Sequence, residues 1–103
     1  MKGLRYLLIK LVSNDKVSRQ SFWNTFHSVL MQIFGEYGFL QADPKIIDYD
    51  EDSLEIILMC KKRGLHLVRV TLVFTTKIDN NPIMAYVARV SGTSKKLKDI
   101  RQH

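Results

Sequence analysis

The sequence predicts a single α/β domain spanning residues 1–103, on three observations. Apolar residues alternate along residues 4–13, they recur at helical spacing along residues 18–37, and turn-forming residues separate the apolar segments that follow. At 103 residues the chain is long enough for one core and not two. Its 46% apolar content, with five Gly and two Pro, is typical of a folded protein.

Leu4 to Ser13 is predicted as a strand whose side chains point alternately to two faces. One face would carry Leu7, Ile9 and Leu11, and the other Tyr6, Leu8, Lys10 and Val12. Because both faces would be largely apolar, we expect a central strand.

A helix is predicted from Ser18 to Tyr37. Ser18 is a good N-cap, Val17 before it is placed to pack on Phe22, and Gly38 supplies a C-terminal stop. We expect the apolar stripe of this helix to lie in the core rather than to bind a cofactor or stack bases. The stripe consists of Phe22, Phe26, Val29, Leu30, Ile33 and Tyr37, widened by Trp23 and Phe34.

An antiparallel hairpin should follow the helix. Its strands are predicted at Lys45 to Tyr49 and at Leu54 to Lys61, joined by a turn at residues 50–53. The clustered acids of that turn lack the spacing of a calcium loop, so an exposed hairpin tip is expected.

Leu65 to Thr76 fits either a helix or a strand, and its Val, Thr and Phe content favours a strand. A turn at Asp79 to Pro82 precedes a strand from Ile83 to Ser91 and a basic, helical tail. If Leu65 to Thr76 is a helix, the order is the βαββαβ pattern of ferredoxin-like and RNA-recognition folds. Such a fold has a four-stranded antiparallel sheet with two helices on one face, here followed by a short basic C-terminal helix.

The charge distribution points to an anionic partner. The net charge is +6, and six of the ten acids lie within residues 43–55, which leaves the rest of the chain more basic. The single cysteine, Cys60, excludes an internal disulfide and fits a reducing compartment. The apolar run near the N-terminus is too short to span a membrane, so a cytoplasmic protein is expected.

The sequence offers little for catalysis by the protein itself. His27, His66 and His103 lack metal-ligand spacing, and Cys60 is expected to be a small core residue. The strand before Cys60 also lacks the stacking aromatics of the RNA-recognition signature, although Tyr6 and Tyr86 could either stack a base or pack on their neighbours.

The junction between the last strand and the tail has the chemistry of a phosphate site. Ser91, Gly92 and Thr93 can donate hydrogen bonds at the start of a helix, where free N–H groups carry partial positive charge. Lys95 and Lys96 follow directly and add full charges. The alternative is that Thr93 only caps the helix.

Several segments together resemble one family. They are Arg5-Tyr6-Leu7, Tyr37-Gly38 with Ala42-Asp43-Pro44, Cys60 with Val68-Arg69, and Val90 to Thr93. In this order they resemble the ribonuclease P protein component 2 group, the archaeal relatives of the eukaryotic Pop-five subunit. The resemblance implies an α/β sandwich akin to the RNA-recognition fold, with Leu65 to Thr76 as a helix.

The resemblance also implies a role in the ribonucleoprotein that cleaves precursor tRNA at its mature 5′ end. The RNA subunit is then the catalyst and holds the Mg²⁺, and the protein binds no cofactor. Its partners are the ribonuclease P RNA, precursor tRNA and the component 3 protein, in a heterotetramer or with self-association.

Residues implied in RNA binding fall in two groups. The first comprises Lys61, Lys62, Arg63 and Arg69, and the second Arg89, Ser91, Gly92, Thr93, Lys95 and Lys96. Met59 and Ser94 depart from the family pattern, which has Arg and a branched apolar residue there. The alternative hypotheses are that the chain is a related ribonuclease P or MRP subunit, or that it is a basic protein-interaction module without an RNA role.

Overall fold

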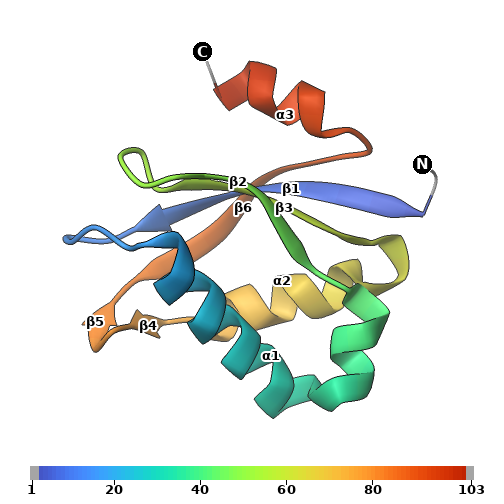
Figure 1. The fold of residues 1–103 in the computed structure, drawn as a ribbon, viewed down its shortest axis with the longest axis horizontal. Helices are drawn as coiled ribbons and strands as arrows, with labels where there is room; N and C mark the ends of the chain where they lie inside the picture. Colours follow the sequence, from blue (N-terminus) through green and yellow to red (C-terminus); the bar gives the residue numbers. More distant parts are fainter. Residues whose placement is uncertain (1–2, 102–103) are drawn as a thin grey trace.

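A computed structural model describes residues 3–101, in which two helices cover one face of a four-stranded antiparallel sheet (Figure 1). The strands are β1 (Leu4–Val12), β2 (Lys45–Asp50), β3 (Glu55–Lys61) and β6 (Met84–Ser91), in the order β2-β3-β1-β6. The two helices are α1 (Arg19–Ala42) and α2 (Leu65–Phe74), and α3 (Ser94–Arg101) lies on the opposite face. The predicted βαββαβ arrangement with an additional C-terminal helix is confirmed.

The core lies between the sheet and helices α1 and α2. The alternation in β1 places Leu7, Ile9 and Leu11 in this core, and the neighbouring β3 contributes Ile56, Leu58 and Cys60. On the other face Leu8 and Ile57 form a smaller cluster with Leu97 of α3. Since β1 pairs with both β3 and β6 and is apolar on both faces, its prediction as a central strand is confirmed.

Helix α1 begins as predicted, because the Ser18 hydroxyl accepts a hydrogen bond from the Ser21 N–H at 3.0 Å. Its predicted end at Gly38 is wrong. The helix is interrupted at Gly35, whose φ of 70° lies in a region that glycine adopts readily, and it then continues to Ala42. Asp43 in the left-handed region then caps it, with its N–H donating to the Phe39 carbonyl at 2.7 Å.

The break at Gly35 changes which side of the helix is buried. Phe22, Phe26 and Leu30 lie in the core as predicted, but Tyr37 is 75% exposed and Ile33 is also exposed. Because the helix is interrupted, the residues after Gly35 are rotated about the helix axis relative to the positions they would take in one continuous helix. The apolar stripe predicted for one unbroken helix therefore ends near the break.

Helix α2 forms where residue preferences alone predicted a strand, so that prediction is wrong. The helix that the family resemblance implied is confirmed. Val68, Thr71 and Leu72 are buried at helical spacing. The Thr71 hydroxyl donates to the Leu67 carbonyl at 2.8 Å, which satisfies a polar group inside the helix pair. Burial of this face against α1 and the sheet outweighs the modest cost of β-branched residues in a helix.

Strand β6 contains a bulge. Leu8 pairs with Arg89 and Ile9 with Val87, so Ala88 has no partner in the register. Val87 and Val90 consequently both pack on the core, while Arg89 is exposed. Before the strand, β4 (Lys77–Ile78) and β5 (Asn81–Pro82) form a small hairpin around the predicted turn.

The acidic turn between β2 and β3 is an exposed tip, as predicted. The Asp50 carboxylate accepts hydrogen bonds from the N–H groups of Asp52 at 3.0 Å and Ser53 at 3.2 Å. No helix within residues 3–101 is both long and apolar enough to cross a membrane.

Candidate nucleic-acid interface

The basic segments and the acidic turn lie at opposite ends of the sheet. Leu4 at the start of β1 pairs with Lys61 at the end of β3, and Tyr6 pairs with Ser91 at the end of β6. Figure 1 shows the start of β1, the connection from β3 to α2 and the turn into α3 at the same side of the molecule, with the acidic hairpin tip at the other. The seven residues of β3 separate the two ends by about 20 Å.

A first hollow, which we call the β3 hollow, is lined by Gly3, Leu4, Lys61, Lys62 and Arg63 and has a volume of about 670 Å³. Residues Lys62–Gly64 form a short 3-10 helix, η1, after β3. The Lys62 N–H donates to the Gly3 carbonyl at 2.7 Å, which fastens this turn to the start of β1. Lys62 and Arg63 are exposed, so their charges face solvent.

The β3 hollow also depends on Gly64, which lies against the end of α1. A Cβ at Gly64 would stand 2.3 Å from the Cα of Ala42, closer than two carbons can approach. Glycine therefore allows the basic turn to lie directly on α1.

A second hollow, the β6 hollow, is formed where β6 runs into α3. It has a volume of about 290 Å³ and is lined by Arg89, Val90, Ser91, Gly92, Lys96 and Leu97. The Ser91 hydroxyl accepts a hydrogen bond from the Thr93 N–H at 3.1 Å, which shapes the turn. Leu97 is 1% exposed and packs with Leu8 and Ile57, so it holds α3 on the sheet.

The predicted RNA-binding residues are only partly brought together. Arg89, Ser91, Gly92 and Lys96 share the β6 hollow, and Lys61, Lys62 and Arg63 share the β3 hollow. Lys95 and Thr93 are exposed beside the β6 hollow without lining it. Arg69 is exposed on α2 and lines neither hollow.

The two hollows are neighbours, because only β1 separates the ends of β3 and β6, a spacing of about 10 Å. The predicted site residues do not include Gly3, Leu4 and Leu97, which help to build the hollows. Of these, Leu97 could have been predicted to anchor the tail, since it is an apolar residue within a strongly basic helix.

The groups considered for catalysis lie elsewhere. Cys60 is buried in the core, as predicted, and this burial raises the pKa of its thiol to about 11 despite the opposing charge of Arg5. His27 is half-buried on α1, edge-on to Phe39 with ring centroids 5.0 Å apart, and His66 is exposed on α2. His103 lies outside the described residues. Among the described residues, no three His, Cys, Asp or Glu side chains are grouped so as to hold a metal ion.

The fold and these surfaces define a small basic α/β protein with cations gathered at one end of its sheet. Residues 5–100 match the sequence profile of the Rpp14/Pop5 family, and the chain belongs to that family. The resemblance seen in the sequence is thereby confirmed.

Two similar sequences carry the same name, Ribonuclease P protein component 2. The protein from Saccharolobus solfataricus is 28% identical over 100 residues, which cover 97% of this chain and 70% of that protein. The protein from Pyrococcus furiosus is 28% identical over 94 residues, which cover 91% of this chain and 78% of that protein. A chain in the cryo-EM structure of yeast ribonuclease MRP has a TM-score of 0.73 and 10% sequence identity, over 99% of this chain and 91% of that one. At that identity the likeness concerns the fold.

Proposed function

We propose that this protein is a subunit of ribonuclease P, the ribonucleoprotein that cleaves precursor tRNA to form its mature 5′ end. The observation that carries the proposal is the match to the Rpp14/Pop5 family over residues 5–100. The gathering of cations beside β1 supports it, because a surface of this kind attracts an RNA backbone.

In this role the protein binds and stabilises the catalytic RNA and performs no chemistry itself. Lys61, Lys62 and Arg63 neutralise phosphates at the β3 hollow, and Arg89, Lys95 and Lys96 do so around the β6 hollow. Ser91, Gly92 and Thr93 add hydrogen-bond donors at the same turn. Arg69, on α2, contacts either RNA or a neighbouring protein. The RNA holds the Mg²⁺ that the reaction uses, and the protein carries no cofactor.

The proposed partners are the ribonuclease P RNA, precursor tRNA and the component 3 protein, in a cytoplasmic complex. Exposed apolar side chains that are neighbours support a protein partner, because a soluble monomer rarely exposes a large contiguous apolar patch. On the sheet, Val12 of β1 pairs with Met84 of β6, and Tyr86 is two residues further along β6. On the helices, the exposed apolar residues include Ile33, Tyr37, Leu40, Val73 and Phe74. Light scattering of the chain with component 3 distinguishes a heterodimer from a heterotetramer.

Reconstituted cleavage of precursor tRNA tests the function. The RNA and its other proteins are assembled with and without this chain and component 3, at limiting Mg²⁺. Cleavage should fall when the chain is omitted and also with the Lys95→Ala/Lys96→Ala double variant. Undiminished cleavage without the chain would overturn the proposal.

Capture of the bound RNA from cells separates the two related assignments. Recovery of ribonuclease P RNA with precursor tRNA supports the proposal, and recovery of a ribonuclease MRP RNA alone would assign the chain to that enzyme. Recovery of protein without any RNA would favour an interaction module.

A further inference from the structure

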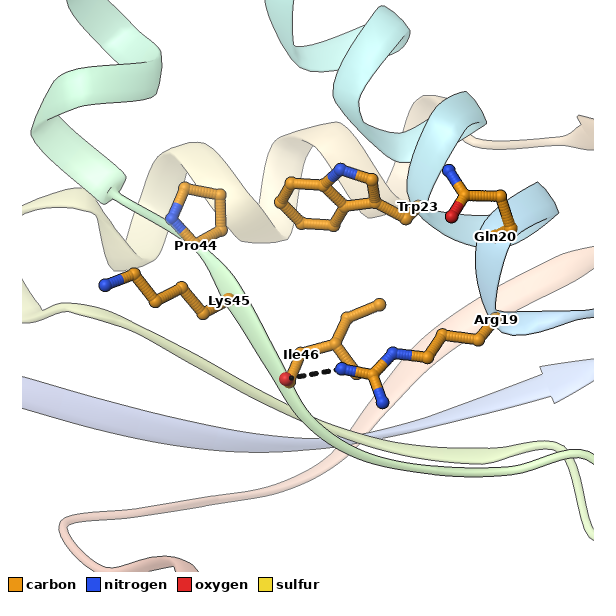
Figure 2. Close-up of a pocket in the computed structure, with 6 residues that line it drawn as sticks. All are labelled: Arg19, Gln20, Trp23, Pro44, Lys45 and Ile46. Atoms are coloured by element: carbon orange, nitrogen blue, oxygen red, sulfur yellow. Dashed lines mark hydrogen bonds between the residues drawn. The ribbon is translucent and has the colours of Figure 1, made fainter.

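A third hollow lies away from the basic end of the sheet, where α1 begins and β2 starts. We call it the α1 hollow. It has a volume of about 320 Å³ and is lined by Arg19, Gln20, Trp23, Pro44, Lys45 and Ile46 (Figure 2). This volume lies at the lower end of the roughly 300–1,000 Å³ that small-molecule sites occupy. The hollow is therefore large enough for one small, flat ligand.

The walls of the α1 hollow are held in place from both sides. Arg19, Gln20 and Trp23 share one face of α1, since they are three and four residues apart. The Arg19 guanidinium donates to the Ile46 carbonyl at 3.2 Å and ties that face to β2. Opposite, Pro44 is buried and has a fixed φ, and it follows the αL cap at Asp43.

Trp23 offers an aromatic surface to the α1 hollow. Its indole is half-buried, with ring centroids 6.1 Å from Phe26 and 6.0 Å from His27. These ring contacts restrict the orientation of the indole. Figure 2 shows the six-membered ring of the indole directed toward Pro44, across the hollow. A flat ring that entered here would lie against an aromatic and a proline surface.

The polar groups around the indole suit a nucleotide. Arg19 and Lys45 are both exposed and form no ion pair with the residues that the structure describes, so both charges are available to an anion. The guanidinium keeps further donors after its bond to Ile46. In Figure 2 the Lys45 side chain runs away from the indole, which places its ammonium at the outer rim. The Gln20 amide N–H₂ donates to the Asn24 side chain at 2.7 Å, and this leaves its carbonyl oxygen as an acceptor.

We propose that the α1 hollow binds one unpaired nucleotide of an RNA strand. The base stacks on Trp23 and lies against Pro44, its edge donates to the Gln20 carbonyl, and the flanking phosphates contact Arg19 and Lys45. A base in a duplex is covered on both faces and cannot enter, so the site selects single-stranded or extruded nucleotides. This inference rests on the proposed function, to which it adds a contact with unpaired RNA outside the β3 and β6 hollows.

Trp23 is the only tryptophan of the chain, so its fluorescence reports on this site alone. The full-length protein is titrated with hexauridylate, with hexaadenylate, with UMP and with a blunt RNA duplex. Quenching of Trp23 by a hexanucleotide, at least tenfold weaker for UMP and absent for the duplex, is the expected result. Equal binding of UMP and hexauridylate would instead identify a free-nucleotide site, and an unchanged fluorescence at saturating RNA would overturn the proposal.

Substitutions separate the site from general attraction of RNA to a basic protein. Lys45→Ala should weaken the hexanucleotide binding seen by quenching about tenfold, and Lys77→Ala, which removes the same charge from exposed β4, should leave it unchanged. With end-labelled RNA, Trp23→Leu should weaken binding about tenfold and Trp23→Phe should largely restore it. Equal effects of Lys45→Ala and Lys77→Ala would overturn the site.

The two proposals fail in different ways. If the α1 hollow does not bind RNA, reconstituted cleavage should still depend on the chain. If the chain has no role in ribonuclease P, that dependence disappears, but RNA should still quench the fluorescence of Trp23.

Discussion

Gly64 and Ala42 are in direct backbone contact, so that a Cβ on Gly64 would lie 2.3 Å from the Ala42 Cα and 2.7 Å from its Cβ. The contact joins the basic turn after β3 to the end of α1. Gly64 is thus required for close packing. A side chain at this position would collide with the backbone of Ala42, which cannot move aside as the end of a flexible side chain could.

Gly64→Ala should lower the free energy of unfolding by about 3 kcal/mol, because α1 and η1 must separate to admit the methyl group. Gly92→Ala is the matched control, since a Cβ there meets nothing within 4 Å. It should change stability by less than about 0.5 kcal/mol. Urea unfolding of both variants checks this, and equal stabilities would contradict the packing role.

Leu97→Ala should release α3 from the sheet. Leu97 is 1% exposed, and its side chain fills the small cluster with Leu8 and Ile57. We expect a loss of about 2 kcal/mol, at the lower end for a buried leucine, because α3 can undock without opening the main core. Hydrogen exchange should then accelerate in α3 and not in α1. Lys98→Ala, exposed on the same helix, serves as the control.

The salt dependence of RNA binding should report on the β3 hollow. If about four phosphates are neutralised, affinity for ribonuclease P RNA falls as roughly the third to fourth power of salt concentration. Lys62→Ala/Arg63→Ala should reduce that exponent by about 1.5. Lys16→Ala is the control at the opposite end, where Lys16 pairs with Asp52 at 3.4 Å, and should leave it unchanged. An exponent that is equal in both variants would exclude the β3 hollow from phosphate binding.

Stability should fall at high pH through Tyr49. Its hydroxyl donates to the Val17 carbonyl, and burial, with a smaller contribution from Glu51, raises its pKa from 10.0 to about 12. The unfolded chain therefore loses this proton at lower pH than the folded protein. The stabilisation is fully present below pH 10 and is lost as the pH rises toward 12, by up to about 2 kcal/mol.

Tyr49→Phe isolates this contribution. The variant should be about 1 kcal/mol less stable at pH 7, because the Val17 carbonyl loses its donor. The difference from the native chain should shrink above pH 10 and change sign as the pH approaches 12, because the native chain then loses more than the variant lacked at pH 7. Unfolding measured at a series of pH values tests this, and a difference that stays constant would show that Tyr49 does not titrate with unfolding.

Local sequence patterns predicted an element correctly where a single local feature determined it. The alternation in β1 and the Ser18 cap predicted the central strand and the start of α1 correctly. The end of α1 was placed wrongly because two glycines lie close together, and only the backbone angles reveal that Gly35 interrupts the helix while Gly38 is buried within it.

Long-range packing decided the rest. Residue preferences for α2 pointed to a strand, and burial of Val68 and Leu72 against the core outweighed them. The grouping of Leu4 with Lys61 follows from strand register, and that of Arg89 with Lys96 follows from the docking of α3 on the sheet through Leu97; a single sequence specifies neither. The α1 hollow likewise joins residues 19–23 to residues 44–46, which only the packing of α1 beside β2 brings together.

The bulge at Ala88 gives β6 one residue more than its pairing with β1 requires. Side chains in a strand alternate with a period of two, so Val87 and Val90, which are three residues apart, reach the core face together only because one residue between them is extra. Deleting Ala88 would leave Arg89 opposite Leu8 and Val87 opposite Ile9, and would restore plain alternation with Arg89 outward and Val90 inward. The bulge is therefore a position at which β6 can lose one residue while its cationic end keeps its orientation.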